Sequence, residues 1–298
     1  MKTDCKSKTT CNSKTASNSK TACSLCANHC MLEEGRTGLC RVRYNRGGKI
    51  KSNAYGKVTS VSLDPIEKKP LHYFYPGSRI LSLGSYGCNF SCPFCQNYEI
   101  SMAGEEEILS GALPIRYLSP EDAVKMALES RDFGNIGLAH TYNEPLINYE
   151  YVRDCSILAR ETGLKNAVIT NGSASGEVLE EILPWIDAFN VDLKGFTPEF
   201  YQMVHGSLED VKRFIVTAAG KSHVEVTTLV IPGLNDSEEE IGELAGWLAS
   251  IRPDIPLHLN RFFPRYRMTD REATDIGTLL RLADIARSRL RFVKVGNC

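Results

Sequence analysis

The chain has 298 residues, of which 42% are hydrophobic and 24% are charged, values that are ordinary for globular proteins. Its net charge of −1 offers no electrostatic footprint for nucleic acid or for an anionic membrane surface. No apolar run reaches the roughly 18 residues that a membrane-spanning helix needs, and the basic N-terminus lacks the apolar core of a secretory signal. We therefore expect a cytoplasmic protein of one large α/β domain or two smaller ones, with neither nucleic acid nor a membrane as its partner.

The first 22 residues are predicted to form a disordered tail, residues 1–22. The triplet Ser-Lys-Thr recurs in it with a period of six residues. Such a polar repeat cannot bury enough apolar surface to offset the entropy lost on ordering. Cys5 and Cys11 lie in this tail, and we expect them to bind no metal.

Residues 23–78 are predicted to form a small N-terminal module that is rich in cysteine. Four cysteines follow one another with two, three and nine residues between them: Cys23, Cys26, Cys30 and Cys40. Four thiolates complete either a zinc site or a closed iron–sulfur cluster, and the choice between the two is open here. A metal is favoured over free thiols, because many cysteines in a chain without an export signal indicate metal or redox chemistry. A hairpin is expected next, with Ile50 and 58–63 as strands around Gly56.

From residue 79 onward, the pattern alternates between strands and helices. Short apolar runs predict six strands, at 79–83, 135–139, 166–170, 189–193, 223–231 and 256–260. Helices are predicted between and after them, at 120–131, 146–162, 176–183, 208–219, 236–250 and 272–289. Six βα units favour a parallel sheet, yet they cannot close the full eight-stranded barrel. The expected fold is therefore α/β, an open, partial (β/α)6 barrel over 79–298, with a last edge strand at 291–295.

A second group of cysteines follows the first predicted strand, with three and two residues between its members: Cys88, Cys92 and Cys95. Three thiolates can hold three corners of a cubane iron–sulfur cluster and leave the fourth iron open for chemistry. A structural zinc site needs four ligands, and no further Cys or His follows Cys95 at the spacing of a zinc finger. Because the strand before them ends at Gly84, we expect these cysteines on a loop at the carboxyl end of a strand, where parallel α/β folds have their active sites.

This run resembles the cysteine loop of the radical S-adenosylmethionine (radical SAM) superfamily, which has an aromatic residue before its last cysteine, here Phe94. Four further segments, 55–59, 64–70, 76–78 and 95–101, are similar to the radical SAM enzyme of the AmmeMemoRadiSam system. That enzyme is a relative of the pyruvate formate-lyase activating enzymes. The resemblance implies the partial barrel, a [4Fe–4S] cluster on the three cysteines, and S-adenosylmethionine (SAM) as the cofactor bound beside it.

The resemblance also implies which strand ends contact SAM. The second strand ends at a segment that binds the SAM amino group in the superfamily, and there Asn143 stands in place of a glycine. Glu144, the next residue, can pair with the ammonium group. The alternative is that these residues only form a turn and begin a helix. Asn171 ends the third strand and is a further candidate for binding the cofactor.

The last three predicted strands carry the remaining candidates. The resemblance implies that Asp192 reaches a ribose or a cation and that Lys194 pairs with the methionine carboxylate. The alternative is that the two side chains form a solvated ion pair at the end of a strand. Val230 and Ile231 would pack on the adenine ring, although ordinary core packing explains them equally well. His258 would lie near SAM, or would be a strand histidine whose hydrogen bonds are satisfied within the protein.

The implied activity is reductive cleavage of SAM to a 5′-deoxyadenosyl radical, with the electron supplied by a donor such as flavodoxin or ferredoxin. Three roles are open. The chain modifies a protein or small molecule together with Memo- and AMMECR-type partners, it activates a glycyl-radical enzyme, or it is a non-catalytic iron–sulfur or zinc protein that handles electrons. Formation of 5′-deoxyadenosine after reduction separates the first two roles from the third.

Overall fold

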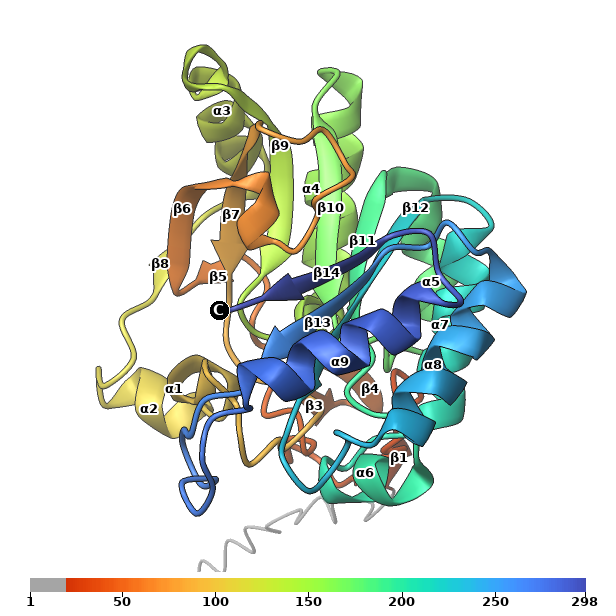
Figure 1. The fold of residues 1–298 in the computed structure, drawn as a ribbon. Helices are drawn as coiled ribbons and strands as arrows, with labels where there is room; N and C mark the ends of the chain where they lie inside the picture. Colours follow the sequence, from red (N-terminus) through yellow and green to blue (C-terminus); the bar gives the residue numbers. More distant parts are fainter. Residues whose placement is uncertain (1–19) are drawn as a thin grey trace, which may run out of the picture.

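The computed structural model describes residues 20–298, in which one eight-stranded sheet curves into a partial barrel (Figure 1). Seven neighbouring strands are parallel: β14 (Val293–Gly296), β13 (Leu257–Arg261), β12 (His223–Val230), β11 (Ala188–Asp192), β10 (Lys165–Thr170), β9 (Asn135–Thr141) and β7 (Arg79–Gly84). The eighth strand, β6 (Ser60–Pro65), pairs with β7 in the antiparallel direction and forms the other edge. The predicted α/β fold is confirmed, and so is the last strand at the edge of the sheet.

Six main helices cover the outer face of the sheet (Figure 1). They are α3 (Pro120–Glu129), α4 (Tyr149–Glu161), α5 (Gly176–Ile182), α7 (Leu208–Ala219), α8 (Glu238–Ile251) and α9 (Ile276–Arg287). The start of α3 shows why the sequence signals a helix there. The Ser119 hydroxyl accepts a hydrogen bond from the Asp122 backbone N–H, and Pro120 occupies the first helical position.

Alternation along each strand separates an outer layer of side chains from an inner one. On the outer side, Leu81 of β7 and Leu138 of β9 pack in one buried cluster with Ala123 and Ala127 of α3. This layer is apolar because helices cover it. Because the strands of this sheet from β7 to β14 run parallel, their carboxyl ends lie together at one end of the sheet.

The inner layer is filled by a segment that follows β6. Ile66 and Leu71 of this segment are fully buried, and they share an apolar cluster with Ala139 and Ala167 of the sheet. Small side chains on the strands leave room for it. The Glu225 carboxylate on β12 accepts hydrogen bonds from two backbone N–H groups of the same segment, at 3.0 and 2.7 Å. This segment therefore occupies the amino-terminal part of the barrel and leaves the carboxyl-terminal part for a ligand.

The predicted hairpin around Gly56 is wrong. The hairpin is formed instead by β3 (Arg43–Arg46) and β4 (Lys49–Ser52), and Gly47 and Gly48 between them both have positive φ. Two such residues suit a two-residue turn whose twist matches that of the strands. β5 (Lys57–Val58) pairs with β8 (Arg116–Tyr117), and β6 belongs to the main sheet, although it precedes the domain boundary expected at residue 78.

The remaining elements lie around the carboxyl end of the barrel. β1 (Thr21–Ala22) pairs with β2 (Met31–Leu32), so the expected disorder is wrong for Thr21 and Ala22, the last two residues of the predicted tail. The rest of the predicted tail, residues 1–19 with Cys5 and Cys11, lies outside the described residues. The short helices α1 (Tyr98–Ser101), α2 (Glu105–Leu109) and α6 (Pro198–Met203) were not predicted. Within residues 20–298, no helix has the length and apolar character needed to cross a membrane.

Candidate active site

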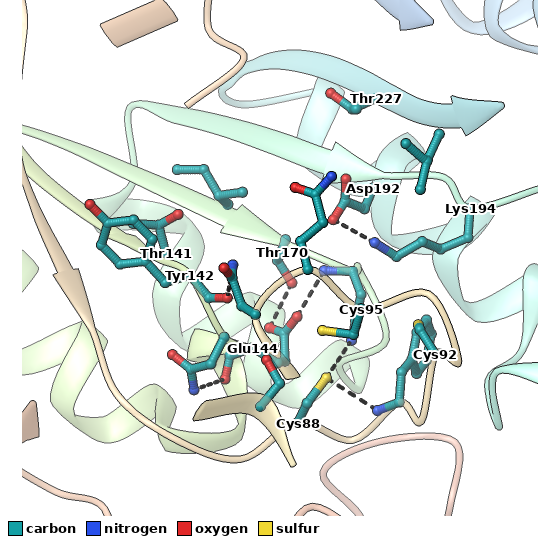
Figure 2. Close-up of a pocket in the computed structure, with 18 of the residues that line it drawn as sticks. Cys88, Cys92, Cys95, Thr141, Tyr142, Glu144, Thr170, Asp192, Lys194 and Thr227 are labelled. Atoms are coloured by element: carbon teal, nitrogen blue, oxygen red, sulfur yellow. Dashed lines mark hydrogen bonds and ion pairs between the residues drawn. The ribbon is translucent and has the colours of Figure 1, made fainter. Parts of the chain in front are cut away.

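A cavity of about 290 Å³ opens at the carboxyl ends of the barrel strands (Figure 2). Residues of four neighbouring strands line it, namely Thr141 of β9, Thr170 of β10, Asp192 of β11 and Thr227 of β12. The three cysteines on the loop after β7, Cys88, Cys92 and Cys95, line it as well. This is the place where parallel barrels bind their ligands, and the size is at the lower end for small-molecule sites.

The cysteine loop is held in shape by close backbone packing. Gly87, which precedes the first cysteine, has a φ of 78°, and a Cβ atom placed on it would lie 2.4 Å from the Cys40 carbonyl oxygen. Only glycine combines this conformation with so close an approach. The Phe90 backbone N–H points at the Cys88 Sγ, 3.3 Å away, and the Asn171 side-chain amide points at the same sulfur from 3.7 Å. The loop therefore presents N–H donors to a thiolate.

The three thiols suit a cluster better than a single ion. Burial raises the pKa of Cys92 to about 12, and burial also raises the pKa of Cys88 well above its usual value. Such thiols ionise when a metal binds them. Among residues 20–298, no three His, Cys, Asp or Glu side chains converge on one point as a single metal ion requires. A cubane accepts a wider spacing, because each thiolate binds a different iron.

Glu144 follows the end of β9 and lies between the cysteine loop and β10 (Figure 2). One carboxylate oxygen accepts hydrogen bonds from the Leu146 N–H at 3.0 Å and the Thr170 hydroxyl at 2.8 Å, and the other accepts one from the Asn171 N–H at 2.8 Å. Burial nevertheless raises the pKa of Glu144 to about 7. A carboxylate has roughly four acceptor sites. One of these acceptor sites is therefore left without a hydrogen bond from the described residues.

Asn143 and Asn171 line the cavity, but their side chains hold the cysteine loop. The Asn143 side chain accepts a hydrogen bond from the Ser85 N–H and donates to the carbonyls of Tyr86 and Gly87, all at 3.0 Å. The Asn171 side chain donates to the Asn89 side-chain oxygen at 2.8 Å. These two residues, predicted to bind the cofactor, therefore have an additional role in positioning the loop.

Asp192 and Lys194 extend from the end of β11 into the cavity, where their side chains pair at 2.7 Å (Figure 2). The Lys194 side chain is 18% exposed. Burial opposes its charge, yet the neighbouring Asp192 carboxylate and Cys92 thiol outweigh burial and raise the pKa of Lys194 above its ordinary value. The cation therefore stays charged next to the cysteines.

The structure does not bring His258 to the cavity. Its Nε2 lies 2.6 Å from the Glu225 carboxylate, and its ring faces that of His72 at 5.0 Å between centroids. Asn260, two residues further along β13, lines the cavity in its place. His258 and Asn260 share one face of β13, because side chains two residues apart on a strand point the same way. Asn260 is nearer to the carboxyl end of the strand, where the cavity opens.

Val230 and Ile231 are likewise fully buried and are not among the residues that line the cavity. Leu229, the preceding residue on β12, lines the cavity instead. Neighbouring residues of a strand point to opposite faces. Core packing therefore explains Val230, and an apolar contact with a ligand in the cavity falls to Leu229.

A polar cluster that the sequence does not predict lies where Tyr142 and Lys69 line the cavity. The Tyr142 hydroxyl donates a hydrogen bond to Asp64 at 2.5 Å, and the Lys69 ammonium lies 2.8 Å from the same carboxylate. Lys69 is only 3% exposed, and together with Tyr142 it lines the cavity. Asp64 and Lys69 belong to a segment with a family resemblance. Nothing in its pattern, however, places that segment inside the barrel.

The second set of cysteines lies beside the first. Cys23, Cys26 and Cys40 are buried, and Cys30 is partly buried. Figure 1 shows their surroundings, β1, β3 and β4, grouped at the lower end of the molecule, the end toward which the barrel strands point. The Asn28 side-chain amide donates to the Asn89 carbonyl of the other loop at 2.8 Å. The two sets of cysteines therefore belong to one region of the molecule.

Comparisons with known proteins agree with this geometry. The model of the radical SAM superfamily matches residues 83–245. An uncharacterised protein of Methanocaldococcus jannaschii is 38% identical over 92% of this chain and 80% of its own length. The pyruvate formate-lyase-activating enzyme of Clostridium pasteurianum is 27% identical over 63% of this chain and 82% of its own length.

Solved structures show the same fold. Streptococcus suis SuiB bound to S-adenosylmethionine has a TM-score of 0.57 at 14% identity, over 74% of this chain and 52% of its own. A radical SAM methyltransferase from Sphaerobacter thermophilus has a TM-score of 0.54 at 19% identity, over 75% of this chain and 67% of its own. The superfamily model covers more than half of the chain, including the three cysteines and most of the cavity. The chain therefore belongs to the radical SAM superfamily and is a radical SAM enzyme with a [4Fe–4S] cluster and SAM as its cofactors.

Proposed function

We propose that this chain binds SAM beside a cluster on Cys88, Cys92 and Cys95 and directs the hydrogen abstraction that these cofactors initiate. The observation that carries the proposal is that three thiols, a lysine and a buried carboxylate face one cavity. When bound and reduced by one electron, the cofactors supply a 5′-deoxyadenosyl radical. The protein's own part is to bind, to orient and to exclude water.

The side chains divide this work by charge. Cys88, Cys92 and Cys95 would hold three irons of the cluster, and the fourth would remain open to SAM. Lys194 suits the methionine carboxylate, and the remaining acceptor site of Glu144 suits an N–H of the SAM amino group. Asp192 suits a ribose hydroxyl. The first step needs no side chain as an acid or a base, and we assign none.

The relatives named as activating enzymes support a polypeptide as the substrate. In its specific form, the proposal is that the radical removes a hydrogen atom from a glycine residue of a large partner enzyme. Memo- and AMMECR-type partners stay a prediction of the sequence. The electron comes from a one-electron donor such as flavodoxin or ferredoxin.

Isotope transfer tests the choice of substrate. A glycyl-radical enzyme labelled with α-deuterated glycine is incubated anaerobically with the reduced chain and SAM. The proposal predicts deuterium in the 5′-deoxyadenosine and a glycyl-radical EPR signal in the partner. Formation of 5′-deoxyadenosine without deuterium and without the radical would contradict the glycine assignment and leave the cleavage of SAM in place.

A further inference from the structure

The four cysteines of the N-terminal module, Cys23, Cys26, Cys30 and Cys40, form a second group of thiols next to the catalytic loop. The thiols of Cys23, Cys26 and Cys40 are close enough to interact electrostatically with one another. The fourth, Cys30, is tied to the first by a backbone hydrogen bond from the Cys23 N–H to the Cys30 carbonyl at 2.9 Å. Gly38 packs against the Cys30 sulfur, since a Cβ atom on it would lie 3.4 Å away.

This group also has N–H donors that point at sulfur. The Arg43 backbone N–H lies 3.3 Å from the Cys40 Sγ, and the Asn28 side-chain amide lies 3.8 Å from the Cys26 Sγ. The distance at Cys40 equals that from the Phe90 N–H to the Cys88 Sγ in the other loop. Hydrogen bonds to sulfur help to set the reduction potential of an iron–sulfur cluster. Both groups of cysteines therefore receive N–H donors at their sulfur atoms.

The two groups are joined by Asn89, which lies in the loop of the first cluster. The Asn28 side-chain amide, which lies 3.8 Å from the Cys26 Sγ, donates to the Asn89 carbonyl at 2.8 Å. The Asn89 side-chain oxygen lies 4.0 Å from the Cys88 Sγ. The Gly87 backbone of the same loop packs directly on the Cys40 carbonyl. Two residues, Asn28 and Asn89, thus connect Cys26 of the module to Cys88 of the catalytic loop.

The module also reaches the surface. Met31 follows Cys30 and is 58% exposed, and Leu39 precedes Cys40 and is 60% exposed. The thiols of Cys23, Cys26 and Cys40 are as buried as that of Cys92, so it is the exposed neighbours Met31 and Leu39 that bring the module to the surface. An electron donor that contacts Met31 and Leu39 would approach the module first, and the catalytic cluster would be reached through it.

We propose that Cys23, Cys26, Cys30 and Cys40 hold a second iron–sulfur cluster that passes electrons to the catalytic one, an inference that rests on the proposed function. One electron leaves a low-potential protein donor, resides on the second cluster, and then reduces the first; no bond is made or broken. A zinc ion carries no electron, and it would need its four sulfurs within about 3.8 Å of one another at a Zn–S distance near 2.3 Å. Among residues 20–298, no group of three or more His, Cys, Asp or Glu side chains is arranged to hold a single metal ion.

Metal analysis of the full-length chain tests the proposal. A cubane contains four irons, so the anaerobically reconstituted wild type should hold roughly eight irons and eight sulfides. The variant Cys88→Ala/Cys92→Ala/Cys95→Ala should keep roughly four of each, since its module is intact. Cys23→Ala/Cys26→Ala/Cys40→Ala should keep the other four. Cys155→Ala, at a buried cysteine outside both groups, is the matched control and should keep all eight.

Two further readouts test the relay itself. The EPR spectrum of the fully reduced wild type should show magnetic interaction between two clusters, and each cluster-deletion variant should lack it. In the module variant, SAM cleavage driven by reduced flavodoxin should fall at least about tenfold, whereas cleavage driven by dithionite should stay within twofold.

Two outcomes would overturn the proposal. One is zinc, or no metal, in the variant that keeps only the module. The other is an unchanged rate with flavodoxin in the module variant. Neither outcome touches the proposed cleavage of SAM, which fails only if the wild type with dithionite forms no 5′-deoxyadenosine.

Discussion

Lys194 is the cation that the cavity presents next to the cysteines. Its partner Asp192 lies 2.7 Å away, and both side chains are partly exposed to the cavity. On a solvated surface such a pair contributes little. In a partly dry site that receives a carboxylate, the same ammonium makes a charge-assisted contact worth about 1.5–3 kcal/mol. The two interpretations of the pair therefore differ in a measurable quantity.

Lys194→Met should weaken SAM binding roughly tenfold to a hundredfold while the iron content stays unchanged, because methionine keeps the apolar stem and loses the charge. Titration of SAM into the reduced variant, followed through the EPR signal of the cluster, measures this. Lys165→Met is the matched control, because Lys165 pairs with Asp187 at 3.3 Å at the opposite end of the barrel. Equal SAM affinity in the two variants would show that Lys194 only forms a surface ion pair with Asp192 and does not bind the SAM carboxylate.

His140 makes stability depend on pH. It lies on the outer face of β9, 3% exposed, its ring is packed on Tyr151, and its Nε2 has no hydrogen-bond partner among the described residues. Burial lowers the pKa of His140 from 6.5 to about 4. Protonation of His140 is disfavoured in the folded state, so its neutral ring costs no unfolding free energy above pH 6.5. As the pH falls toward 4 the unfolded state takes up the proton more readily, and the protein loses about 3 kcal/mol of unfolding free energy at 1.36 kcal/mol per pKa unit.

The His140→Leu variant should lack this part of the acid sensitivity. Urea unfolding of the metal-free protein at intervals from pH 7 to pH 4 measures it. The wild type should lose about 3 kcal/mol more unfolding free energy across this range than the variant does. Parallel pH profiles for the two proteins would show that His140 is not held neutral by burial.

Long elements could be predicted from the sequence, and contacts between distant segments could not. The six barrel strands and their helices carry strong periodic patterns, and the helix start at Ser119 has a cap that can be recognised locally. The short helices α1, α2 and α6 are too brief to show a period. The sequence pattern predicts the hairpin at Gly56 and not at Gly47 and Gly48, because several turns of similar composition follow one another.

The candidate site shows the same division. The three catalytic cysteines, Asp192 and Lys194 are adjacent to strand ends, so a local pattern finds them. Lys69 and His258 depend instead on the segment that fills the barrel. That segment is held by Glu225, whose sequence separation from it exceeds 150 residues. No local pattern reports such a contact.

The backbone of Gly87, in the loop after β7, packs directly on the N-terminal module. Gly87→Ala should remove the catalytic cluster, because the new Cβ would meet the Cys40 carbonyl at 2.4 Å in a conformation that alanine disfavours. Gly134→Ala is the control, since Gly134 has a φ of 85° and open space around it. The control should lose only about 1–2 kcal/mol of unfolding free energy and keep its iron. Iron counting distinguishes the two, and full iron in Gly87→Ala would contradict the packing argument.

As a whole, the molecule brings its chemistry to one end. The inner segment closes the amino-terminal part of the barrel, and the N-terminal module packs on the catalytic loop at the carboxyl end. Figure 1 shows the resulting arrangement, with the helices outside and the small N-terminal strands below the sheet. A ligand therefore enters where the thiols, Lys194 and Glu144 converge.

The most direct measurement is SAM cleavage by a chain without its catalytic thiols. The full-length wild type and Cys88→Ala/Cys92→Ala/Cys95→Ala are reconstituted anaerobically, reduced with dithionite and given SAM, and 5′-deoxyadenosine is quantified. Circular dichroism establishes that the variant is folded. We predict product from the wild type and none above background from the folded variant, because its chain offers no thiolates to hold the open iron. Formation of 5′-deoxyadenosine by that variant would contradict the assignment of the active site.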